Sequence, residues 1–330
     1  MRDSFDRESR RLVALANECN VTLSDCIDII MALKMDRANL PIPERVHLKL
    51  VEFYCLSSGH IQEQMHRLRL GRRSLLAPNI ALQSSKFSIT ASDFSSIIER
   101  VVRHGYAVLP FSLTQQEAIR LLERSHSFFY RNCLLDDGSR THASSLAEVN
   151  TSTTSGKRIS TAHADEESIL ADEEFRSLIC DPVILSLVSF LLGGEAILRH
   201  VSCWHSFPSS RPNSEAAQLF HFDLDEFKWL KLFIFLTDVE SNSGPHVYIP
   251  ASHLPGTKPR ELLRHGYARI FDEEIEKYYP RHTWKTLLCK KGTMVLADTR
   301  CWHKGTQVLS GVRSVLQPEY SLSTFSKSLF

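Results

Sequence analysis

The chain has 330 residues, enough for one large domain with an appendage or for two modest domains. Hydrophobic residues make up 43% and charged residues 23%, a composition that excludes a mostly disordered or a fibrous chain. Lys and Arg total 39 and Asp and Glu total 38, so the net charge of +1 gives no general attraction to nucleic acid.

The sequence also carries no signal for a membrane or for secretion. No apolar run approaches the roughly 18 residues that a membrane helix needs, and the first residues lack the apolar stretch of a secretory signal. We therefore expect a cytoplasmic protein without membrane or nucleic-acid partners. The eight cysteines are scattered without a C-x-x-C pair, which favours reduced thiols over a disulfide framework.

The first quarter of the chain is predicted to be helical. In residues 1–76, Ser24 can cap one helix, Pro43 suits the first turn of a second, and residues 61–70 carry the apolar spacing of a third. Residues 77–92 are polar and are predicted to form a linker. This part of the chain is therefore interpreted as a helical N-terminal extension.

Helices and a long loop are predicted in the next hundred residues. A helix runs into a short strand at Tyr106–Leu109, and residues 114–129 form a strongly periodic helix. Residues 136–168 are rich in Ser, Thr, Asp and Gly and are predicted to be a long loop, a feature that is often functional. Another helix covers Pro182–Leu192 and ends at a Gly-Gly pair.

From Ala196 onward the chain consists of short β-rich runs separated by Pro, Gly, Ser and Asn. Many short strands at this spacing indicate an antiparallel sandwich or barrel. Helices followed by strands predict an α+β fold rather than an alternating α/β fold. The runs are Ala196–Trp204, Ala217–Phe222, Trp229–Leu236, His246–Ile249, Thr293–Ala297 and Val312–Gln317.

The residues with the clearest chemical meaning are His221, Asp223 and His303. On a strand, residues i and i+2 point to the same face, so the imidazole of His221 and the carboxylate of Asp223 can reach one metal ion. His303, from a distant strand, would complete a set of two histidines and one carboxylate. Such a set leaves three positions open on Fe(II) for a co-substrate and oxygen.

The chain holds a second H-x-D, His163-Ala164-Asp165. We reject this copy as a metal site because it lies in the predicted Ser/Thr-rich loop, with no strand before it. The His221 copy follows a strand-like run and precedes the apolar strand Leu230–Leu236.

Arg313 lies ten residues after His303. A hairpin turn at Ser310-Gly311 would place the two segments side by side. A guanidinium in that position can bind a carboxylate through two parallel hydrogen bonds. An ordinary surface arginine is the alternative.

These motifs together resemble the phytanoyl-CoA dioxygenase-like family of Fe(II)/2-oxoglutarate-dependent oxygenases. The resemblance covers roughly residues 90–325. It is carried by the H-x-D at His221, a Gly-Pro pair, a Pro-Ala-Ser-His turn, and the distal His303 and Arg313. The supporting segments are His104–Leu109, Asp181–Gly194, His221–Val239, Ser243–His253 and Gly292–Asp298.

The resemblance implies a double-stranded β-helix, a cupin-like jelly roll, over residues 93–330. It implies iron held by His221, Asp223 and His303, and the distal carboxylate of 2-oxoglutarate held by Arg313. Fe(II), 2-oxoglutarate and O2 would be required, with ascorbate in a supporting role. Related halogenases lack the carboxylate ligand, so Asp223 favours hydroxylation, desaturation or ring closure over halogenation.

The sequence departs from the family pattern after the distal histidine. Lys304 and Gly305 stand where many members place a hydroxyl residue that helps to hold the co-substrate. The second contact to 2-oxoglutarate is left open among Thr306, Lys231 and Gln218.

A zinc site is an alternative use of the repeated tripeptides Cys203-Trp204-His205 and Cys301-Trp302-His303. Two cysteines and two histidines could hold a structural zinc ion. This interpretation leaves His221 and Asp223 unexplained, so we favour Cys203 and Cys301 as small buried residues and expect His205 to line the pocket.

Three functions are consistent with the sequence. The first is a 2-oxoglutarate-dependent dioxygenase that oxidises an unactivated C–H of a small organic substrate, with 2-oxoglutarate converted to succinate and CO2, in specialised metabolism. The second is a jelly roll that binds a metal or ligand without turnover. The third is a protein whose residues 1–76 dock a partner or form a homo-oligomer.

Overall fold

The computed structural model describes residues 2–22, 24, 25, 28, 44–70, 80–151, 158–209, 217–264, 266 and 268–322. Its helices are α1 (Arg2–Glu18), α3 (Glu44–Ser57), α4 (His60–Leu70), α5 (Ala91–His104), α6 (Gln115–Ser125), α7 (Leu146–Thr151), α8 (Glu166–Ala171), α9 (Glu173–Ile179), α10 (Pro182–Leu192), α11 (Arg260–Leu263) and α12 (Asp272–Glu276), with the 3-10 turn η3 (Arg281–Thr283). Its strands are β1 (Tyr106–Val108), β2 (Tyr130–Leu135), β3 (Arg140–Ala143), β4 (Ile159–His163), β5 (Ile197–Ser206), β6 (Trp229–Phe235), β7 (His246–Tyr248), β8 (Lys285–Leu287), β9 (Met294–Ala297), β10 (His303–Gly305) and β11 (Arg313–Ser321).

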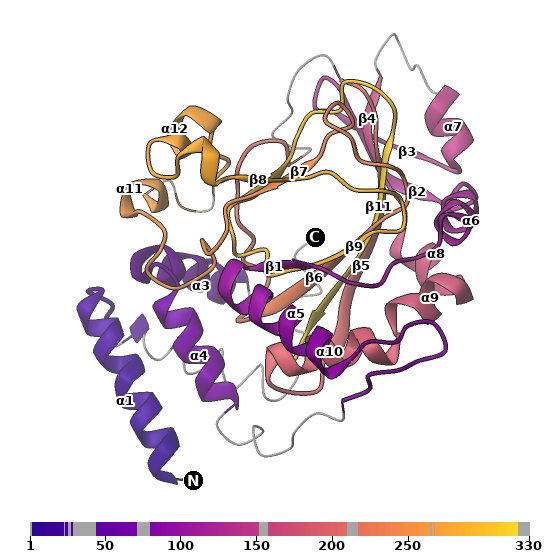
Figure 1. The fold of residues 1–330 in the computed structure, drawn as a ribbon. Coiled ribbons are helices and arrows are strands. Elements are labelled where there is room, and N and C mark those ends of the chain that lie inside the picture. Colours follow the sequence, from indigo (N-terminus) through magenta and orange to yellow (C-terminus); the bar gives the residue numbers. More distant parts are fainter. Residues whose placement is uncertain are drawn as a thin grey trace.

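Two antiparallel sheets form the walls of a barrel (Figure 1). The larger sheet has the strand order β1-β9-β6-β11-β5-β4-β2-β3, and the smaller has the order β10-β7-β8. From β5 onward the chain passes repeatedly between the sheets, because β6, β9 and β11 belong to the larger and β7, β8 and β10 to the smaller. This alternation is the double-stranded β-helix predicted for this α+β chain.

Strand β6 shows how the larger sheet separates two interiors. Leu230, Leu232 and Ile234 pack into the core beneath the helices, while Lys231 and Phe233 line a cavity inside the barrel. The separation follows from the two-residue period of a strand. Both faces of β6 are buried, which is why the sequence shows an almost unbroken apolar run there.

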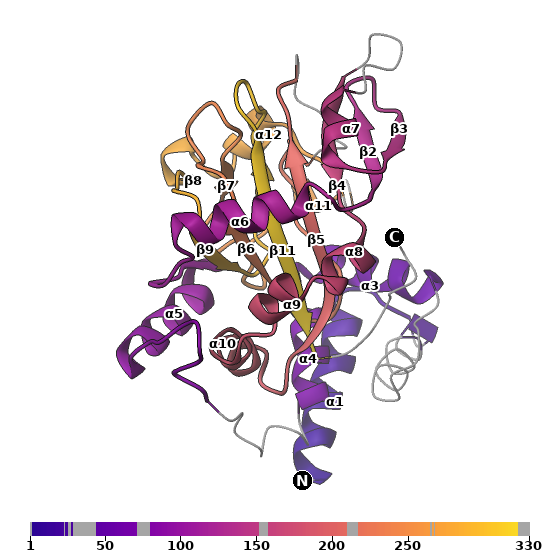
Figure 2. The same ribbon diagram turned by 90° about the vertical axis from the view of Figure 1, so that its right-hand side faces the viewer.

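Helices α6, α9 and α10 cover the outer face of the larger sheet (Figure 2). Helix α10 begins where the Asp181 side chain accepts hydrogen bonds from two backbone amides and Pro182 occupies the first turn. It ends at Gly193, whose φ of 76° is a left-handed conformation that glycine adopts easily. The predicted bounds of this helix are confirmed.

No helix in the described ranges is by itself long and apolar enough to cross a membrane. Only α9 and α10 taken together satisfy that test of length and composition, and they are bent by 41° where they meet.

Helices α1, α3 and α4 lie together on one side of the molecule (indigo and violet in Figure 1). They share an apolar cluster that also includes one residue of the barrel segment, Phe227. The helices predicted after Pro43 and over residues 61–70 are confirmed as α3 and α4. The helix predicted from Ser24 falls mostly outside the described residues.

The predicted long loop over residues 136–168 is wrong. Strand β3, helix α7 and strand β4 lie within it, and β4 pairs with β5 through Thr161 opposite Ser206 and His163 opposite Trp204. The side chains of β4 are Ile, Ser, Thr, Ala and His, which show no apolar alternation. Pairing with β5 therefore defines this strand, and local sequence could not reveal it.

His205 of β5 is buried on the face that is turned toward the helices. Its Nε2 lies 2.7 Å from the Tyr130 hydroxyl and its Nδ1 lies 2.7 Å from the Ser314 hydroxyl. Burial lowers the pKa of His205 to about 3, so the imidazole is neutral in the folded protein.

We expect this histidine to make stability depend on pH. The unfolded chain takes up a proton at His205 near pH 6.5 and the folded chain does not, so the stabilisation is complete above pH 6.5 and is lost as the pH falls toward the folded pKa. Between pH 6.5 and pH 5 the loss from this residue is about 2 kcal/mol. Urea unfolding at both pH values should show a smaller loss for His205→Gln than for the wild type; equal losses would contradict the prediction.

Candidate metal centre

Three side chains that the sequence analysis selected meet inside the barrel. His221 and Asp223 come from the segment between β5 and β6, and His303 begins β10. One ligand atom from each lies within 4.8 Å of the other two. The Asp223 carboxylate is 3.8 Å from His221 Nε2 and 3.7 Å from His303 Nε2. In the described part of the chain, no other group of three His, Cys, Asp or Glu side chains is close enough to hold an ion.

Backbone hydrogen bonds bring the two ligand segments together. The His221 amide donates to the His303 carbonyl at 3.0 Å, and the His303 amide donates to the His221 carbonyl at 2.8 Å. The predicted strand over Ala217–Phe222 is reduced to isolated bridges at Phe220 and His221. A further backbone hydrogen bond adds to these bridges, because the Asp223 amide donates to the Thr299 carbonyl at 2.9 Å.

Both histidines are oriented for metal binding. His221 Nδ1 lies 3.0 Å from the Leu219 carbonyl and His303 Nδ1 lies 2.9 Å from the Cys301 carbonyl. A carbonyl can only accept, so each Nδ1 carries the proton and each Nε2 offers a lone pair to the space beside Asp223. Burial lowers the pKa of both imidazoles, which keeps them neutral. Two neutral imidazoles and a carboxylate suit Fe(II) and leave coordination positions open.

A buried lysine compensates the carboxylates of the site. Lys231 Nζ, on β6, lies 2.8 Å from Asp223 Oδ2, 2.7 Å from Asp225 Oδ2 and 3.4 Å from Glu319 Oε2. Glu319 is also ion-paired with Arg199. Lys231, one of the candidates for the second 2-oxoglutarate contact, is therefore part of an ion-pair network next to the candidate metal centre.

The network sets the charge states of its members. Burial alone would lower the pKa of Lys231, but Asp223, Asp225 and Glu319 outweigh it and raise this pKa well above its usual value. Burial would raise the pKa of Asp223, but the Lys231 ammonium holds it well below its usual range. Asp223 is consequently a carboxylate before any ion binds. Burial and the Asp225 carboxylate raise the pKa of Glu319 to about 7.

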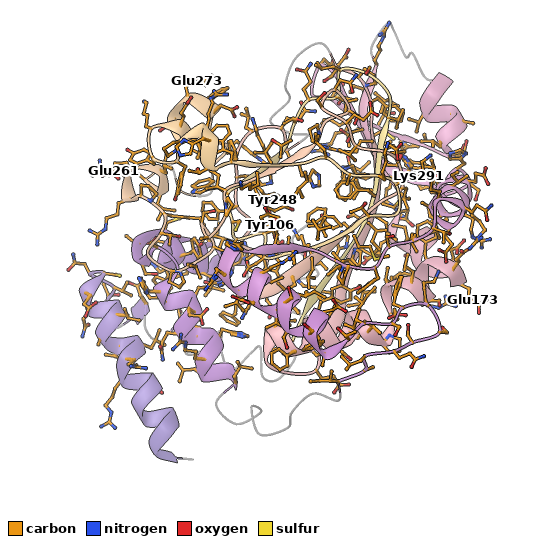
Figure 3. All side chains as sticks on the ribbon, viewed as in Figure 1. Tyr106, Glu173, Tyr248, Glu261, Glu273 and Lys291 are labelled. Atoms are coloured by element: carbon orange, nitrogen blue, oxygen red, sulfur yellow. The ribbon has the colours of Figure 1, made fainter. Side chains whose placement is uncertain are left out.

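Two stacked tyrosines support the distal histidine. Tyr248 of β7 pairs with His303 in the smaller sheet, and their rings stack at 5.7 Å with an interplanar angle of 17°. Tyr106 of β1 stacks on Tyr248 in turn at 5.1 Å, and Figure 3 shows the two tyrosines next to each other in the barrel. The His303 ring is therefore held flat against a fixed wall.

Arg313, at the start of β11, is buried and lines the same cavity. Its guanidinium donates to the Gly244 carbonyl and to the Ser206 hydroxyl at 3.2 Å, and its Nε is buried without a partner in the described part of the chain. A Cβ on Gly305 would lie 3.0 Å from this guanidinium, so glycine leaves it room. No carboxylate among the described residues pairs with Arg313, so its buried charge is available to an anionic group in the cavity.

The predicted hairpin between His303 and Arg313 is wrong in its pairing. Strand β10 pairs with β7 in the smaller sheet, and β11 pairs with β5 and β6 in the larger sheet. The two residues face the same cavity from different walls rather than from adjacent strands.

The structure distinguishes between the three candidates for a second 2-oxoglutarate contact by whether they line the cavity. Thr306 donates to the Pro245 carbonyl at 3.0 Å and Gln218 is buried; neither lines the cavity. Lys231 does line it, with its ammonium engaged by carboxylates.

The zinc alternative fails in the structure. Cys203 and His205 face the helix-covered core on β5, whereas Cys301 packs in another cluster with its Sγ 3.5 Å from His253 Nδ1. The four side chains therefore do not converge, and His205 does not line the cavity as expected. The seven cysteines within the described ranges are free thiols, as predicted.

The rejected H-x-D also does not form a metal pair, although the reason given for rejecting it is wrong. His163 lies on strand β4, where its ring stacks on Trp204 at 5.8 Å. Asp165 pairs instead with Arg131 at 2.8 Å. His163 lines the cavity as a neutral side chain, because burial lowers its pKa to about 4.

Four further cavity residues were not predicted as site residues from the sequence: Asp225, Arg199, Glu319 and His246. Asp225 stands two residues after Asp223, so the strand period that selected the first carboxylate could have selected the second. Arg199 and Glu319 meet through the pairing of β5 with β11, for which no local signal exists. His246 lines the cavity from β7, where burial lowers its pKa well below the usual value.

Family comparison agrees with this geometry. The model of the phytanoyl-CoA dioxygenase (PhyH) family matches residues 101–314. The chain belongs to this family. It is accordingly a 2-oxoglutarate-dependent non-haem iron enzyme that uses iron, 2-oxoglutarate and O2. No curated protein matches the chain.

Several solved structures are similar at low identity. The non-heme alpha ketoglutarate dependent epimerase SnoN from nogalamycin biosynthesis is 16% identical over 70% of this chain and 84% of its own, with a TM-score of 0.49. HygX from Streptomyces hygroscopicus, with nickel and 2-oxoglutarate bound, is 15% identical over 71% and 87%, with a TM-score of 0.47. EctD from S. alaskensis is 19% identical over 74% and 82%, with a TM-score of 0.48. The family assignment stands on the family match alone.

Replacing Lys231, the cation that the carboxylates of this PhyH-family site share, should destabilise the folded protein. In Lys231→Met, the carboxylates of Asp223, Asp225 and Glu319 stay buried without their common partner, and breaking such a network costs about 3–5 kcal/mol. Urea unfolding of the metal-free protein at neutral pH measures the loss. Lys290→Met is the matched control, because Lys290 is 73% exposed and its pair with Asp238 should contribute less than about 1 kcal/mol. Similar losses in the two variants would contradict the prediction.

Proposed function

We propose that His221, Asp223 and His303 hold the iron and that Arg313 binds the distal carboxylate of 2-oxoglutarate in an enzyme that oxidises a C–H of a small polar molecule. The main support is the convergence of two oriented Nε2 lone pairs and one ionised carboxylate in a single cavity. Arg313 lines the same cavity as a buried cation, and the described residues provide no counter-ion for it.

Iron and 2-oxoglutarate, when bound, supply an oxidant for unactivated C–H bonds, with succinate and CO2 as co-products. The chain contributes positions and charges. The carbonyls of Leu219 and Cys301 keep the Nδ1 protons of His221 and His303 in place, and Lys231 keeps Asp223 ionised. Arg313 orients an anionic group by charge-assisted hydrogen bonds, each worth about 1.5–3 kcal/mol.

The carboxylate at position 223 supports hydroxylation, or a related desaturation or ring closure. Asp223 is oriented by its amide bond to Thr299 and by its ion pair with Lys231. A halide would need the coordination position that this carboxylate occupies. Halogenation is therefore not part of the proposal.

The cavity wall indicates the class of substrate. The cavity has a volume of about 470 Å³, which is the size for a small molecule. Its apolar lining side chains, among the described residues, are Trp204, Ala217 and Phe233, and nearly all the others are polar or charged. An acyl chain in such a cavity would desolvate many polar groups without replacing their hydrogen bonds.

Three polar side chains of this wall are available to a ligand. Thr161 and His163 on β4 and Gln317 on β11 line the cavity, and none of them donates or accepts a side-chain hydrogen bond within the described part of the chain. Polar groups in a largely buried cavity are normally satisfied by water or by a ligand. We therefore propose a hydrophilic substrate, with hydroxyl, amide or amino groups that face β4 and β11.

Loss of a metal ligand should remove turnover. In His221→Ala and Asp223→Ala, iron-dependent formation of succinate from 2-oxoglutarate should fall to background, because two donors do not hold the ion in this geometry. Arg313→Ala should retain turnover at a much higher KM for 2-oxoglutarate. Succinate release at varied 2-oxoglutarate measures both effects. Normal release in either ligand variant, or an unchanged KM for Arg313→Ala, would contradict the assignment.

A two-panel assay should identify the substrate class. Sugars, polyols and amino acids form one panel, and fatty acids and acyl thioesters of similar mass form the other. We expect succinate release above the substrate-free rate only with members of the hydrophilic panel, and a several-fold higher KM for the active compound in Gln317→Leu. Stimulation by the acyl panel would show that the polar wall does not select the substrate.

A further inference from the structure

The reverse side of the metal centre is an aromatic cluster. Phe222 stands between His221 and Asp223, and Trp302 stands directly before His303. Because side chains alternate along extended chain, both rings point away from the cavity when the ligands point into it. The two rings meet edge to face at 4.8 Å with an interplanar angle of 87°, and both are fully buried.

A residue of the N-terminal helices completes this cluster. Tyr54 of α3 is 1% exposed and stacks on Phe222 at 5.2 Å with an interplanar angle of 28°. Lys258 Nζ lies between 5.1 and 5.8 Å from the ring centroids of Tyr54, Phe222 and Trp302. It also donates to the Arg300 carbonyl at 2.7 Å and to the Ser252 carbonyl. Tyr54 therefore packs against the ring of Phe222, which lies between two of the ligands in the chain.

Polar contacts fix the helices to the same part of the barrel. The Gly256 amide donates to the Ser58 carbonyl at 2.8 Å, and the Ser58 hydroxyl donates to the Lys258 carbonyl at 3.1 Å. Gln62 of α4 donates to the Glu226 carbonyl, three residues after Asp223. Phe227 then inserts into the apolar cluster of α1, α3 and α4. The helices therefore contact the back of the His221–Asp223 segment through Tyr54, and they contact the residues that follow it through Gln62.

The His221–Asp223 segment needs such support. It is not part of a continuous strand, and its backbone is held by isolated bridges at Phe220 and His221 and by the Asp223–Thr299 hydrogen bond. Backbone hydrogen bonds determine which residues of the segment lie opposite its neighbours. How deeply the segment lies in the barrel then depends on the packing of its side chains. The Phe222 ring is the part of the segment on which packing from outside can act.

We propose that Tyr54 is a positioning residue for the metal centre, and that α3 and α4 form the back wall that holds His221, Asp223 and His303 at metal-binding distance. This inference rests on the proposed metal site. It assigns residues 44–70 to the enzyme's own site rather than to a detachable docking module. Groups that hydrogen-bond to metal ligands typically change metal affinity 10–100-fold when they are removed, and a ring that sets the position of the ligand segment from behind should act in the same direction.

The test measures metal affinity rather than turnover. Metal-free protein is titrated with Fe(II) at saturating 2-oxoglutarate without oxygen, and the visible charge-transfer band of the complex gives the dissociation constant. Tyr54→Ala should weaken Fe(II) binding about ten-fold or more. Tyr54→Phe, which keeps the ring, should bind as tightly as the wild type. Tyr54→Leu keeps most of the buried volume without the flat ring and should also weaken binding, so it serves if Tyr54→Ala does not fold.

Leu121→Ala is the matched control. Leu121 is on α6, is fully buried and packs in the core between the helices and the larger sheet, outside both the cluster of the N-terminal helices and the one with Phe222. This variant should lower the urea midpoint of unfolding and leave the dissociation constant of the folded protein unchanged. Wild-type affinity in both Tyr54→Ala and Tyr54→Leu would overturn the inference, as would equal weakening in Leu121→Ala. Absence of the band in the wild type would instead contradict the proposed function.

Discussion

The site depends on the two reciprocal backbone hydrogen bonds between His221 and His303, at 3.0 and 2.8 Å. They join segments that lie far apart in the chain, so the place of each imidazole depends on the other segment. The same pairing that turns the ligands into the cavity turns Phe222 and Trp302 to the opposite side. The metal-binding face and the aromatic face are therefore two sides of one backbone feature, and a change in packing on one side moves groups on the other.

Charge imposes a second constraint on the same few residues. A lysine in the middle of a fully buried strand is unfavourable unless it is paired. Lys231 is tolerated in β6 because Asp223 and Asp225 approach it from the preceding segment and Glu319 approaches from β11. The same ammonium keeps Asp223 ionised, so the strand's stability and the ligand's charge state depend on one residue. The site is thereby prepared electrostatically before a metal ion enters.

Local patterns were sufficient where one short extended segment decides the chemistry. The two-residue period selected His221 and Asp223, and the structure brings both together with the distal histidine. Arg313 was selected by its distance from His303, but the expected hairpin was wrong because the two residues belong to different sheets. His163 was assigned to a loop because its strand acquires its character only by pairing with β5. Glu319 gave no signal, since its partners come from β5 and β6. Non-local pairing is the common cause of these errors.

The family match begins at residue 101, whereas contacts that support the metal centre begin earlier in the chain. The family match and the supporting contacts begin at different residues for a physical reason. A metal ligand must be one particular residue type, because only certain atoms bind the ion. A ring behind the ligand needs only bulk, flatness and a fixed place, and a helix from any part of the chain can supply these. Tyr54 and the Glu63–Arg300 ion pair, at 3.8 Å, extend the working unit of this enzyme beyond the segment that its motifs define.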